Sequence, residues 1–594
     1  RRQRQMCIRD RVRLDADNIP STFGNGGYVV SIYTFDPDEK DSTYASEKDW
    51  ICNKGVLNSS EIRNAATGET IADSVFCYPR WGRQEYCSPA EARFRQHPQD
   101  YLDGLRHVIG EVVAARPDAA PHIRAVSVDT TASTPCLVDR TGTPLPLRPE
   151  YADDPDAMFV LWKDHTAQRE AEEITALCAR SEVNYARHSG NHYSAECFWA
   201  KCLHLLRGSR RLRRDAYAMV ELCDWIPAVL TGADDPGAIR ASHCAAGSKQ
   251  MWAEAWGGFP PEAFFEALDP ALLPIVRNIS KTNRTCDHAA GTITPAWAQT
   301  LGLPEGVVVG VGNIDAHAGA VGAGIRCGTV VLNLGTSACH MALMPSDEMG
   351  GRLVEGIFGQ VDSSIVPGMV GFEAGLSAFG DVYAWSRNLL CWPLEELLVQ
   401  PGAPDAQARQ RLAEECRDKI MGRLAEEAER LELRADMPLA TDWLNGRRNP
   451  YPAPELTGTL TGLRLSTTAP EIYYALAEAT AFATKAILDH LAANGVAIER
   501  LTGIGGISQK SPFVMQLLAE VTGREISVID CKQACAMGSV VYATVIAGCY
   551  GSVEEAQRAL CNFPSRRYTP RAERHPLLMQ RYERYKAQGG LPQR

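Results

Sequence analysis

One segment, residues 307–344, constrains the fold more than any other part of the chain. An apolar run at 307–311 ends in small residues and is followed closely by a carboxylate, Asp315. A second apolar run at 329–334 leads into the sequence Gly-Thr-Ser at 335–337. Polar residues that directly follow buried strands lie where α/β proteins place their chemistry. The first position offers a base, and the second offers a tight turn of backbone N–H groups and hydroxyls that suits a phosphate.

Asp315 has three interpretations. As a general base it would need to lie within hydrogen-bonding reach of a substrate hydroxyl. It fits equally well as the cap of a helix that begins at Ala316. With His317, two residues later, it would supply two ligands to a metal ion, but a zinc site needs at least a third.

The glycine-containing turns have alternatives when each is taken alone. Residues 335–337 fit either a phosphate-binding turn or an ordinary β-hairpin turn. Gly503, Gly505 and Gly506 resemble part of a dinucleotide-binding fingerprint but lack its third glycine at the required spacing. Their position between a strand and a helix still suits a nucleotide whose purine lies flat on bare backbone.

Polar residues in the first half of the chain also have more than one interpretation. The hydroxyl-bearing run that follows Asp129 would either bind a polyol or form a local turn. Glu196 and Lys201 lie among aromatic residues, where surface salt bridges are the simplest interpretation. None of these motifs decides the function by itself.

Composition narrows the class of protein. The chain has 594 residues, of which 45% are hydrophobic and 22% are charged, so large cores are expected. A net charge of −11 argues against nucleic acid as a partner and favours a small-molecule substrate. The 19 cysteines are scattered without a CxxC pair, which suits reduced thiols. No apolar stretch is long enough for a membrane span, and the arginine-rich start lacks the apolar core of a secretory signal, so a cytoplasmic enzyme is predicted.

Strands and helices alternate in both halves, which predicts two α/β domains. A helix is expected to begin at the cap Thr468, with an early proline and Glu471, and to end at Asn494. The strand at 307–311 is assigned, with those that follow it, to a second sheet that begins beyond about residue 300. The other predicted elements include strands at 69–78, 123–128 and 526–529 and helices at 98–115 and 534–547.

Taken together and in order, these motifs resemble the FGGY carbohydrate kinases, most closely the bacterial L-ribulokinase branch of that family. The first half contributes Asp129-Thr-Thr-Ala-Ser-Thr-Pro, MFVLWKDHTA at 158–167, the run from Ser194 to Lys201, and ELCDWIPAVLTG at 221–232. The second half contributes the Asp315 segment, GTSACH at 335–340, VPGMVGFEAGLSAFGDVYAW at 366–385, DWLNGRRNP at 442–450 and GGISQKSPFVMQLLAEVTGRE at 505–525. The resemblance extends over residues 64–570.

The resemblance implies an α/β, actin-like ATPase fold, with two ribonuclease-H-like lobes on either side of a central cleft. We expect an atypical N-terminal segment at 1–63, an N-terminal sugar-binding lobe at 64–301, a C-terminal ATP-binding lobe at 302–570, and a C-terminal tail helix at 571–594.

The resemblance also implies roles for individual residues. Asp315 would be the catalytic base that takes a proton from the sugar hydroxyl. The sugar would be contacted by Ala132, Lys201, Asp315 and Glu373. The phosphates would lie on Gly335, Thr336 and Ser337, and the adenosine on Gly505, Gly506 and Gln509. Mg²⁺ would arrive with ATP, and a homodimer is left open.

One family feature is missing. The family begins with a strand that ends in Asp-Phe-Gly-Thr/Ser and continues into a hairpin, which wraps the phosphates and helps to hold the metal. Residues 28–32 fit the start of that strand, but 33–63 carry no such motif. The basic, unpatterned start at 1–13 suggests a non-native beginning, and a frame-shifted 5′ end would explain both features. We expect the first sheet to lack a central strand for this reason.

The function expected from these observations is ATP-dependent phosphorylation of L-ribulose to L-ribulose 5-phosphate in L-arabinose catabolism. The alternatives are a kinase for another pentulose or pentitol, such as D-ribulose, xylulose or ribitol, and a catalytically impaired sugar-binding homologue.

Overall fold

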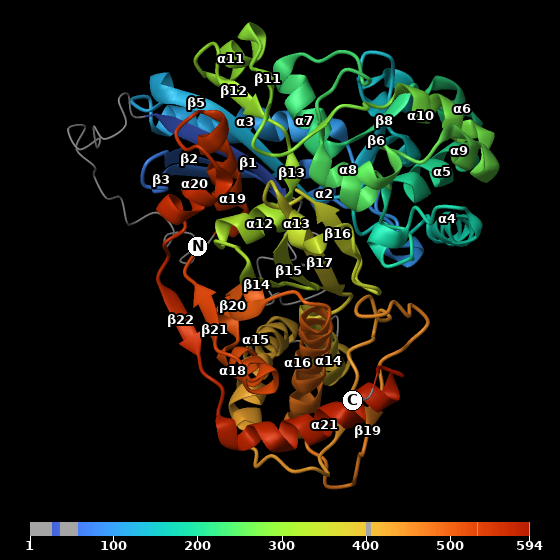
Figure 1. The fold of residues 1–594 in the computed structure, drawn as a ribbon. Coiled ribbons are helices and arrows are strands. Elements are labelled where there is room, and N and C mark those ends of the chain that lie inside the picture. Colours follow the sequence, from blue (N-terminus) through green and yellow to red (C-terminus); the bar gives the residue numbers. More distant parts are fainter. Residues whose placement is uncertain (1–26, 36–56, 400–404, 532, 593–594) are drawn as a thin grey trace.

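The computed structural model describes residues 27–35, 57–399, 405–531 and 533–592. These residues form two α/β lobes, each built on one mixed seven-stranded sheet, with helices α12 and α19 lying between the sheets (Figure 1). The prediction of two α/β domains is therefore confirmed.

The first sheet has the strand order β11-β12-β5-β1-β2-β3, and β13 also pairs with β5. Its central strand β1 pairs in antiparallel with β2 and in parallel with β5. The strands are β1 (Tyr28–Phe35), β2 (Leu57–Asn64), β3 (Thr70–Cys77), β5 (Ile123–Thr130), β11 (Ala289–Thr292), β12 (Val308–Gly310) and β13 (Asn313–Ile314).

The second sheet has the order β16-β17-β15-β14-β20-β21-β22. In both sheets one strand of an antiparallel set pairs in parallel with a later strand, which in turn pairs in parallel with another: β1, β5 and β12 in the first sheet, and β14, β20 and β21 in the second. The strands are β14 (Gly328–Leu334), β15 (Ala338–Pro345), β16 (Gly359–Asp362), β17 (Met369–Leu376), β20 (Ile498–Ile504), β21 (Ile526–Ile529) and β22 (Ser565–Tyr568).

Two expectations about the first sheet were wrong. The strand predicted at 307–311 forms β12, which pairs in parallel with β5 and therefore belongs to the first sheet, not to a lobe that begins at residue 302. The central strand expected to be missing is present as β1, and the segment 1–63 also supplies most of β2. Short apolar runs do not reveal their partners, because pairing is decided by distant strands. The missing phosphate-loop motif was expected within 33–63, much of which lies outside the described residues.

Helices α12 (Asp315–Gly322) and α19 (Ala534–Ile546) connect the lobes. α19 packs against β1 and β5 of the first sheet, and α12 packs against both α19 and β14. The two helices approach very closely, because a Cβ atom added to Gly538 would lie 1.8 Å from the carbonyl oxygen of Ala318. This packing fixes the start of α12, and with it Asp315, at the junction of the lobes.

The remaining helices cover the sheets. α16 begins as predicted at Thr468, whose backbone N–H donates to the Glu471 carboxylate at 2.9 Å, in a capping box. The predicted tail helix is formed by α21, whose Arg581 pairs with Glu478 of α16 inside the second lobe. The main helices are α3 (Pro98–Ala115), α4 (Gln168–Arg180), α5 (Phe198–Gly208), α7 (Leu222–Thr231), α8 (His243–Lys249), α14 (Gly380–Pro393), α15 (Ala406–Glu429), α16 (Ala469–Ala493), α17 (Gly506–Lys510), α18 (Pro512–Thr522), α20 (Val553–Leu560) and α21 (His575–Gln588).

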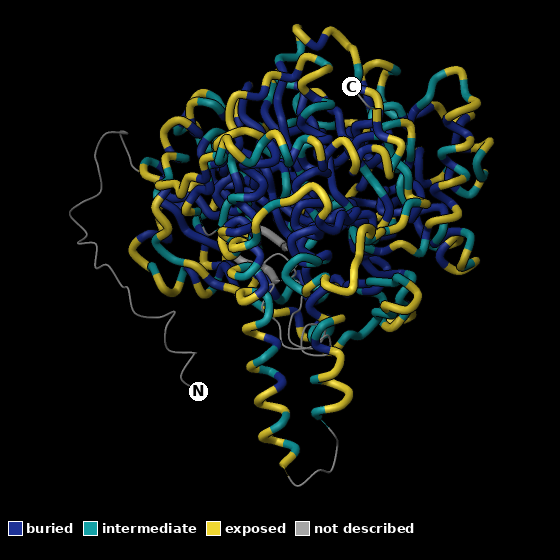
Figure 2. Tube along the Cα trace, turned by 90° about the horizontal axis from the view of Figure 1, so that it is seen from below, coloured by how far each residue is buried: buried dark blue, intermediate teal, exposed yellow. Residues whose placement is uncertain are grey.

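Burial is concentrated in the body of the molecule. Figure 2 shows α14 and α15 projecting from this body, with mostly exposed or partly exposed residues in the projecting parts. In the part of the chain that the structure describes, no helix combines the length and the apolar character needed to cross a bilayer.

Candidate active site

A cleft between the lobes brings the predicted residues of both halves together. It contains about 720 Å³ of empty space, part of which is open to solvent. The cleft is lined by Thr131, Ala132, Trp162, Glu196, Lys249, Ile314, Asp315, Ala316, Asn333, Gly335, Thr336, Ser337, Cys339, Glu373 and Arg448. Four of the predicted positions, Ala132, Asp315, Glu373 and the 335–337 turn, are therefore neighbours in space.

Asp315 stands at the first position of α12, directly after β13. The backbone N–H of Ala316 donates to its carboxylate at 2.7 Å. Burial, followed by repulsion from the Asp129 carboxylate, raises the pKa of Asp315 to about 8. The carboxylate thus combines a helix-start position with a clearly perturbed proton affinity, which is typical of functional groups in clefts.

Glu373, on β17, is held from two other elements. The Lys249 ammonium at the end of α8 lies 3.5 Å from one carboxylate oxygen, and His317 Nε2 lies 3.1 Å from the other. Burial opposes its ionisation, but Lys249 and His317 outweigh it and hold the pKa of Glu373 well below its usual range. Both ring nitrogens of His317 bond other side chains, Nε2 with Glu373 and Nδ1 with Cys244. The interpretation of Asp315 and His317 as a pair of metal ligands is therefore not supported.

A second ion pair crosses the cleft. Arg448, in a loop of the second lobe, donates to the Glu196 carboxylate at 2.6 Å, and His165 Nε2 lies 3.2 Å from the same oxygen. Glu196 is 9% exposed. Burial opposes its charge, but Arg448 and then His165 lower the pKa of Glu196 far below normal. The interpretation of Glu196 as part of a surface salt bridge is therefore wrong.

Lys201 lies elsewhere. Its ammonium is buried and donates to the backbone carbonyls of Ser133 at 2.6 Å and Leu161 at 2.9 Å. It does not line the cleft, whereas the neighbouring residues Ala132 and Trp162 do. The described contacts of Lys201 are thus with the two loops that form one wall of the cleft, and its role as a direct sugar contact stays a prediction.

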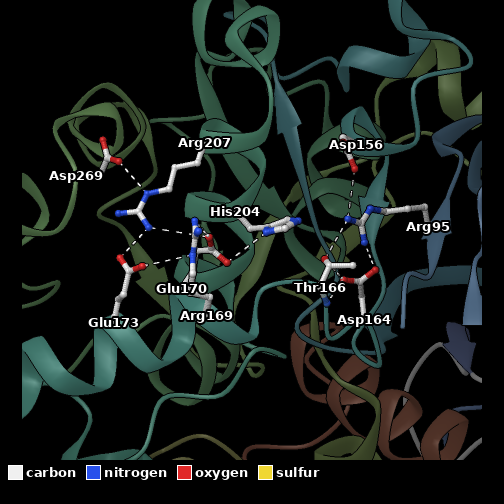
Figure 3. Close-up of polar contacts among 10 residues, drawn as sticks. All are labelled: Arg95, Asp156, Asp164, Thr166, Arg169, Glu170, Glu173, His204, Arg207 and Asp269. Atoms are coloured by element: carbon white, nitrogen blue, oxygen red, sulfur yellow. Dashed lines mark hydrogen bonds and ion pairs between the residues drawn. The ribbon is translucent and has the colours of Figure 1, made fainter. Parts of the chain in front are cut away.

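The loop that carries Trp162 is fixed by a buried carboxylate. Asp164 contacts the Arg95 guanidinium and accepts a hydrogen bond from the Thr166 hydroxyl at 2.6 Å (Figure 3). It also accepts a hydrogen bond from the backbone N–H of Phe94 at 2.7 Å. Asp164 is completely buried. Because this carboxylate is bonded on both oxygens, the 158–167 motif has a structural role behind the cleft wall.

The 335–337 turn joins β14 to β15, so it is a hairpin turn and also a wall of the cleft. It is tied to the start of α14, because the backbone N–H of Gly380 donates to the Gly335 carbonyl at 3.0 Å and that of Phe379 to the Thr336 carbonyl at 2.8 Å. The two interpretations of this turn are therefore compatible.

Gly505 and Gly506 lie beside this turn. Gly505 has φ +89°, and a Cβ atom there would lie 2.7 Å from the carbonyl oxygen of Leu334, the residue before the turn. Only glycine meets both conditions without strain. Gln509 is exposed and donates to the Ile529 carbonyl at 2.8 Å, at the end of β21.

Comparison with known proteins agrees with this geometry. Residues 330–547 match the FGGY family of carbohydrate kinases, C-terminal domain. Over 530 residues the chain is 42% identical to a ribulokinase of Vibrio parahaemolyticus, covering 89% of this chain and 93% of that protein. The fold is similar to a xylulose kinase from Rhodospirillum rubrum, with a TM-score of 0.68 and 19% identity over 95% of this chain and 98% of that chain. It is also similar to a Plasmodium falciparum glycerol kinase solved with ADP, with a TM-score of 0.68 and 13% identity over 96% and 99% of the two chains.

The chain belongs to the FGGY family of carbohydrate kinases. The expected actin-like fold of two lobes around a cleft is thereby confirmed. As an FGGY kinase, the protein is an enzyme that transfers a phosphoryl group from ATP to a sugar.

A larger groove of the FGGY kinase lies near the 335–337 turn. Gly380, which bonds the turn, is at one end of it, and aromatic side chains such as Tyr383 and Phe513 line its walls. The groove contains about 1230 Å³ of empty space including open solvent, between α14, α15 and the start of α18. Gly380 thus links this groove to the turn that lines the cleft, and Asp315 lines the cleft but not the groove.

Sequence reasoning missed two cations of the FGGY kinase site. Arg448 lies within the DWLNGRRNP motif, but nothing in that motif distinguishes it from Arg447, which bonds the carbonyls of Tyr451 and Gly589 instead. Lys249 ends a helix that carries no recognisable motif. Only the packing of α8 against the second lobe brings Lys249 to Glu373.

Proposed function

We propose that this FGGY kinase transfers the γ-phosphoryl group of ATP to the terminal hydroxyl of L-ribulose, giving L-ribulose 5-phosphate in L-arabinose catabolism. The observation that carries the proposal is that Asp315 shares one cleft with the 335–337 turn and with the charged pairs of Glu373 and Glu196. The choice of sugar is supported by the relative at 42% identity that is named a ribulokinase.

Asp315 would act as the general base. A carboxylate at the junction of the lobes would accept the proton of the sugar hydroxyl as its oxygen attacks the γ-phosphorus. In its ionised form, the carboxylate also requires a cationic partner nearby, because burial and Asp129 both disfavour its charge. The phosphates of ATP would lie on the backbone of Gly335, Thr336 and Ser337, with the transferred group directed toward Asp315.

The adenosine would occupy the groove beyond the turn. Its walls combine charged side chains with aromatic and apolar ones, and the latter suit a purine. Gly380 joins the groove to the proposed phosphate-binding turn. Gly505 and Gly506 lie next to the turn and would permit close approach of the nucleotide. Gln509 stays a proposed contact, because its amide bonds a backbone carbonyl in the free protein.

Mg²⁺ would enter with the nucleotide. In the described portion of the chain, no three His, Cys, Asp or Glu side chains are grouped closely enough to hold a metal ion. Asp315 and Asp129 are nevertheless close enough to repel each other, and carboxylate oxygens are the donors that Mg²⁺ prefers. These residues fit a cation held mainly by the phosphates, which when bound neutralises charge on the transferred group.

The sugar would lie among paired charges. Glu373 with Lys249, and Glu196 with Arg448, present acceptors and donors in a confined space. Such a site suits a polyhydroxylated ketose, because a sugar that lacks one hydroxyl would leave a buried charged group without its partner. Ala132 would form the wall beside them, and Lys201 would support that wall from behind or reach the sugar after a shift of its side chain.

A substrate panel tests the proposal. ADP release is measured by a coupled assay with L-ribulose, D-ribulose, D-xylulose, L-xylulose and ribitol at matched concentrations. The expected result is the highest kcat/KM for L-ribulose. A higher kcat/KM for another member would reassign the substrate, and calorimetric binding of L-ribulose without ADP release would indicate an impaired sugar-binding homologue.

The proposal includes a cytoplasmic location. The 17 cysteines in the described part of the chain are all free, including buried ones such as Cys202, which suits a reducing compartment. The negative net charge supports the absence of a nucleic-acid partner. A homodimer stays a prediction, which light scattering after size-exclusion chromatography would test.

A further inference from the structure

A chain of three buried side chains connects both lobes beside the cleft. Cys244 Sγ lies 2.9 Å from His317 Nδ1, and His317 Nε2 lies 3.1 Å from a Glu373 carboxylate oxygen. Cys244, His317 and Glu373 are 4%, 2% and 7% exposed, respectively. Water therefore has little access to these bonds, and each partner is needed to satisfy the next.

The chemistry of the three groups fixes the direction of the hydrogen bonds. The Glu373 carboxylate has no proton and only accepts, so His317 Nε2 must carry the hydrogen that it receives. In a neutral imidazole, Nδ1 is then the acceptor, and the Cys244 thiol is the donor. In an imidazolium, Nδ1 donates to the sulfur instead. In both cases Cys244 fixes the ring so that Nε2–H points at Glu373.

The three residues come from three separate elements. Cys244 is on α8 of the first lobe, His317 is on α12 between the lobes, and Glu373 is on β17 of the second lobe. Lys249, five residues after Cys244 at the other end of α8, also contacts Glu373. One short helix thus holds the Glu373 carboxylate from both sides, directly through an ammonium and indirectly through an imidazole.

We propose that Cys244 and His317 are positioning residues that set the orientation of the Glu373 carboxylate toward the sugar, and thereby the affinity for the sugar. This inference rests on the proposed function only in that Glu373 accepts a sugar hydroxyl. A carboxylate fixed by charge-assisted hydrogen bonds loses little freedom when the sugar binds, which favours affinity. These hydrogen bonds form only when α8 lies against the second lobe. The orientation of the Glu373 carboxylate therefore also depends on the relative position of the two lobes.

Paired variants of Cys244 test the inference. The Cys244→Ala change removes the partner of Nδ1 and is expected to raise the KM and the Kd for the sugar about tenfold, with kcat and the KM for ATP within about twofold. Cys244→Ser keeps a hydroxyl donor at nearly the same place and is expected to stay within about threefold of wild type. Cys202→Ala removes a buried thiol of α5 outside the cleft and serves as the control for lost packing.

A double-mutant cycle distinguishes positioning from general stability. If Cys244 acts through Glu373, then Cys244→Ala in a Glu373→Gln background should change the Kd for the sugar by less than about twofold. Additive effects in the two backgrounds, or equal losses for the Ala and Ser variants, would overturn the inference. Melting temperatures of all variants are measured alongside.

The design separates this inference from the proposed function. Sugar affinity is measured by calorimetry, with L-ribulose and with the best sugar of the panel, so it needs no turnover. Absence of ADP release would reject the kinase assignment while leaving the affinity comparison intact. A normal rate with unchanged sugar affinity in Cys244→Ala would reject the positioning role and leave the kinase assignment standing.

Discussion

The two sides of the cleft differ in the groups that they present: one presents charged side chains and the other presents main chain. On the side proposed to bind the sugar, charged side chains from both lobes meet in close pairs, as in Glu196 with Arg448 and Glu373 with Lys249. On the nucleotide side, the 335–337 turn and Gly505 present main chain at contact distance. Side chains can be exchanged one at a time, whereas a backbone surface requires the local fold itself. We infer that the side chains on the sugar side determine which sugar is bound, and that the backbone surface on the nucleotide side binds ATP.

Two buried lysines of the first lobe, Lys249 and Lys201, differ in the direction in which their surroundings shift the pKa. Burial opposes a charge on both side chains. For Lys249, the Glu373 carboxylate outweighs the effect of burial and raises the pKa. The ammonium of Lys201 bonds backbone carbonyls, and burial lowers its pKa to about 7. The carboxylates of Glu221 and Glu196 oppose the effect of burial on Lys201 but do not outweigh it, whereas for Lys249 the Glu373 carboxylate does. Lys249 is the cation that faces the sugar side.

The largest expected effect is at the position where the two sides meet. Asp315→Asn removes the base and keeps the shape, so kcat should fall by about 10³ to 10⁴-fold. Sugar affinity, measured by calorimetry, should stay within about tenfold. Asp347→Asn, at an exposed helix start, is the matched control. An Asp315→Asn variant with more than a tenth of the wild-type kcat would show that another group takes the proton.

A substitution on the nucleotide side comes next. Gly505→Ala would place a methyl group 2.7 Å from the Leu334 carbonyl and displace the neighbouring turn, so the kcat/KM for ATP should fall about 100-fold, or about 2.7 kcal/mol. The Kd for the sugar should not change. Gly495→Ala is the control, because Gly495 has the same φ of +89° but open space around its Cβ position. Equal losses of ATP affinity in both variants would mean that backbone strain alone is responsible.

A substitution on the sugar side should give the complementary result. Arg448→Ala leaves the buried Glu196 without its main partner, so the KM for the sugar should rise about 10 to 30-fold while the KM for ATP changes little. Arg447→Ala removes the adjacent guanidinium, which bonds backbone outside the cleft, and should lower stability only. If Arg448→Ala instead weakens ATP binding, the division between the two sides is wrong.

The smallest effect is a pH dependence shared by both sides. Because the pKa of Asp315 is raised to about 8, its ionised fraction increases as the pH rises through that value. The kcat/KM for the sugar should therefore increase about fivefold from pH 7 to pH 8 and level off above pH 9. Asp315→Asn should abolish this rise in the residual rate. A flat profile between pH 6 and pH 9 would contradict the raised pKa.

Sequence reasoning was most successful for features whose parts are close together along the chain. Asp315 and the 335–337 turn were located because each directly follows a strand, and both indeed lie in one cleft. The capping box at Thr468 was predicted for the same reason, since its partners are three residues apart. Reasoning failed for β12, which pairs with a strand nearly two hundred residues earlier, and for Glu196, which pairs with Arg448 in a loop of the other lobe.

The sequence by itself determined the α/β alternation, the carboxylate that follows a strand and the glycines at the ends of strands, because these depend on neighbours along the chain. Only the tertiary structure decided which lysine faces Glu373, that Arg448 and not Arg447 reaches the cleft, and that Cys244 and His317 stand behind the Glu373 carboxylate. These contacts join residues of different lobes, and their geometry is set by how α8, α12 and β17 pack, which no local pattern records.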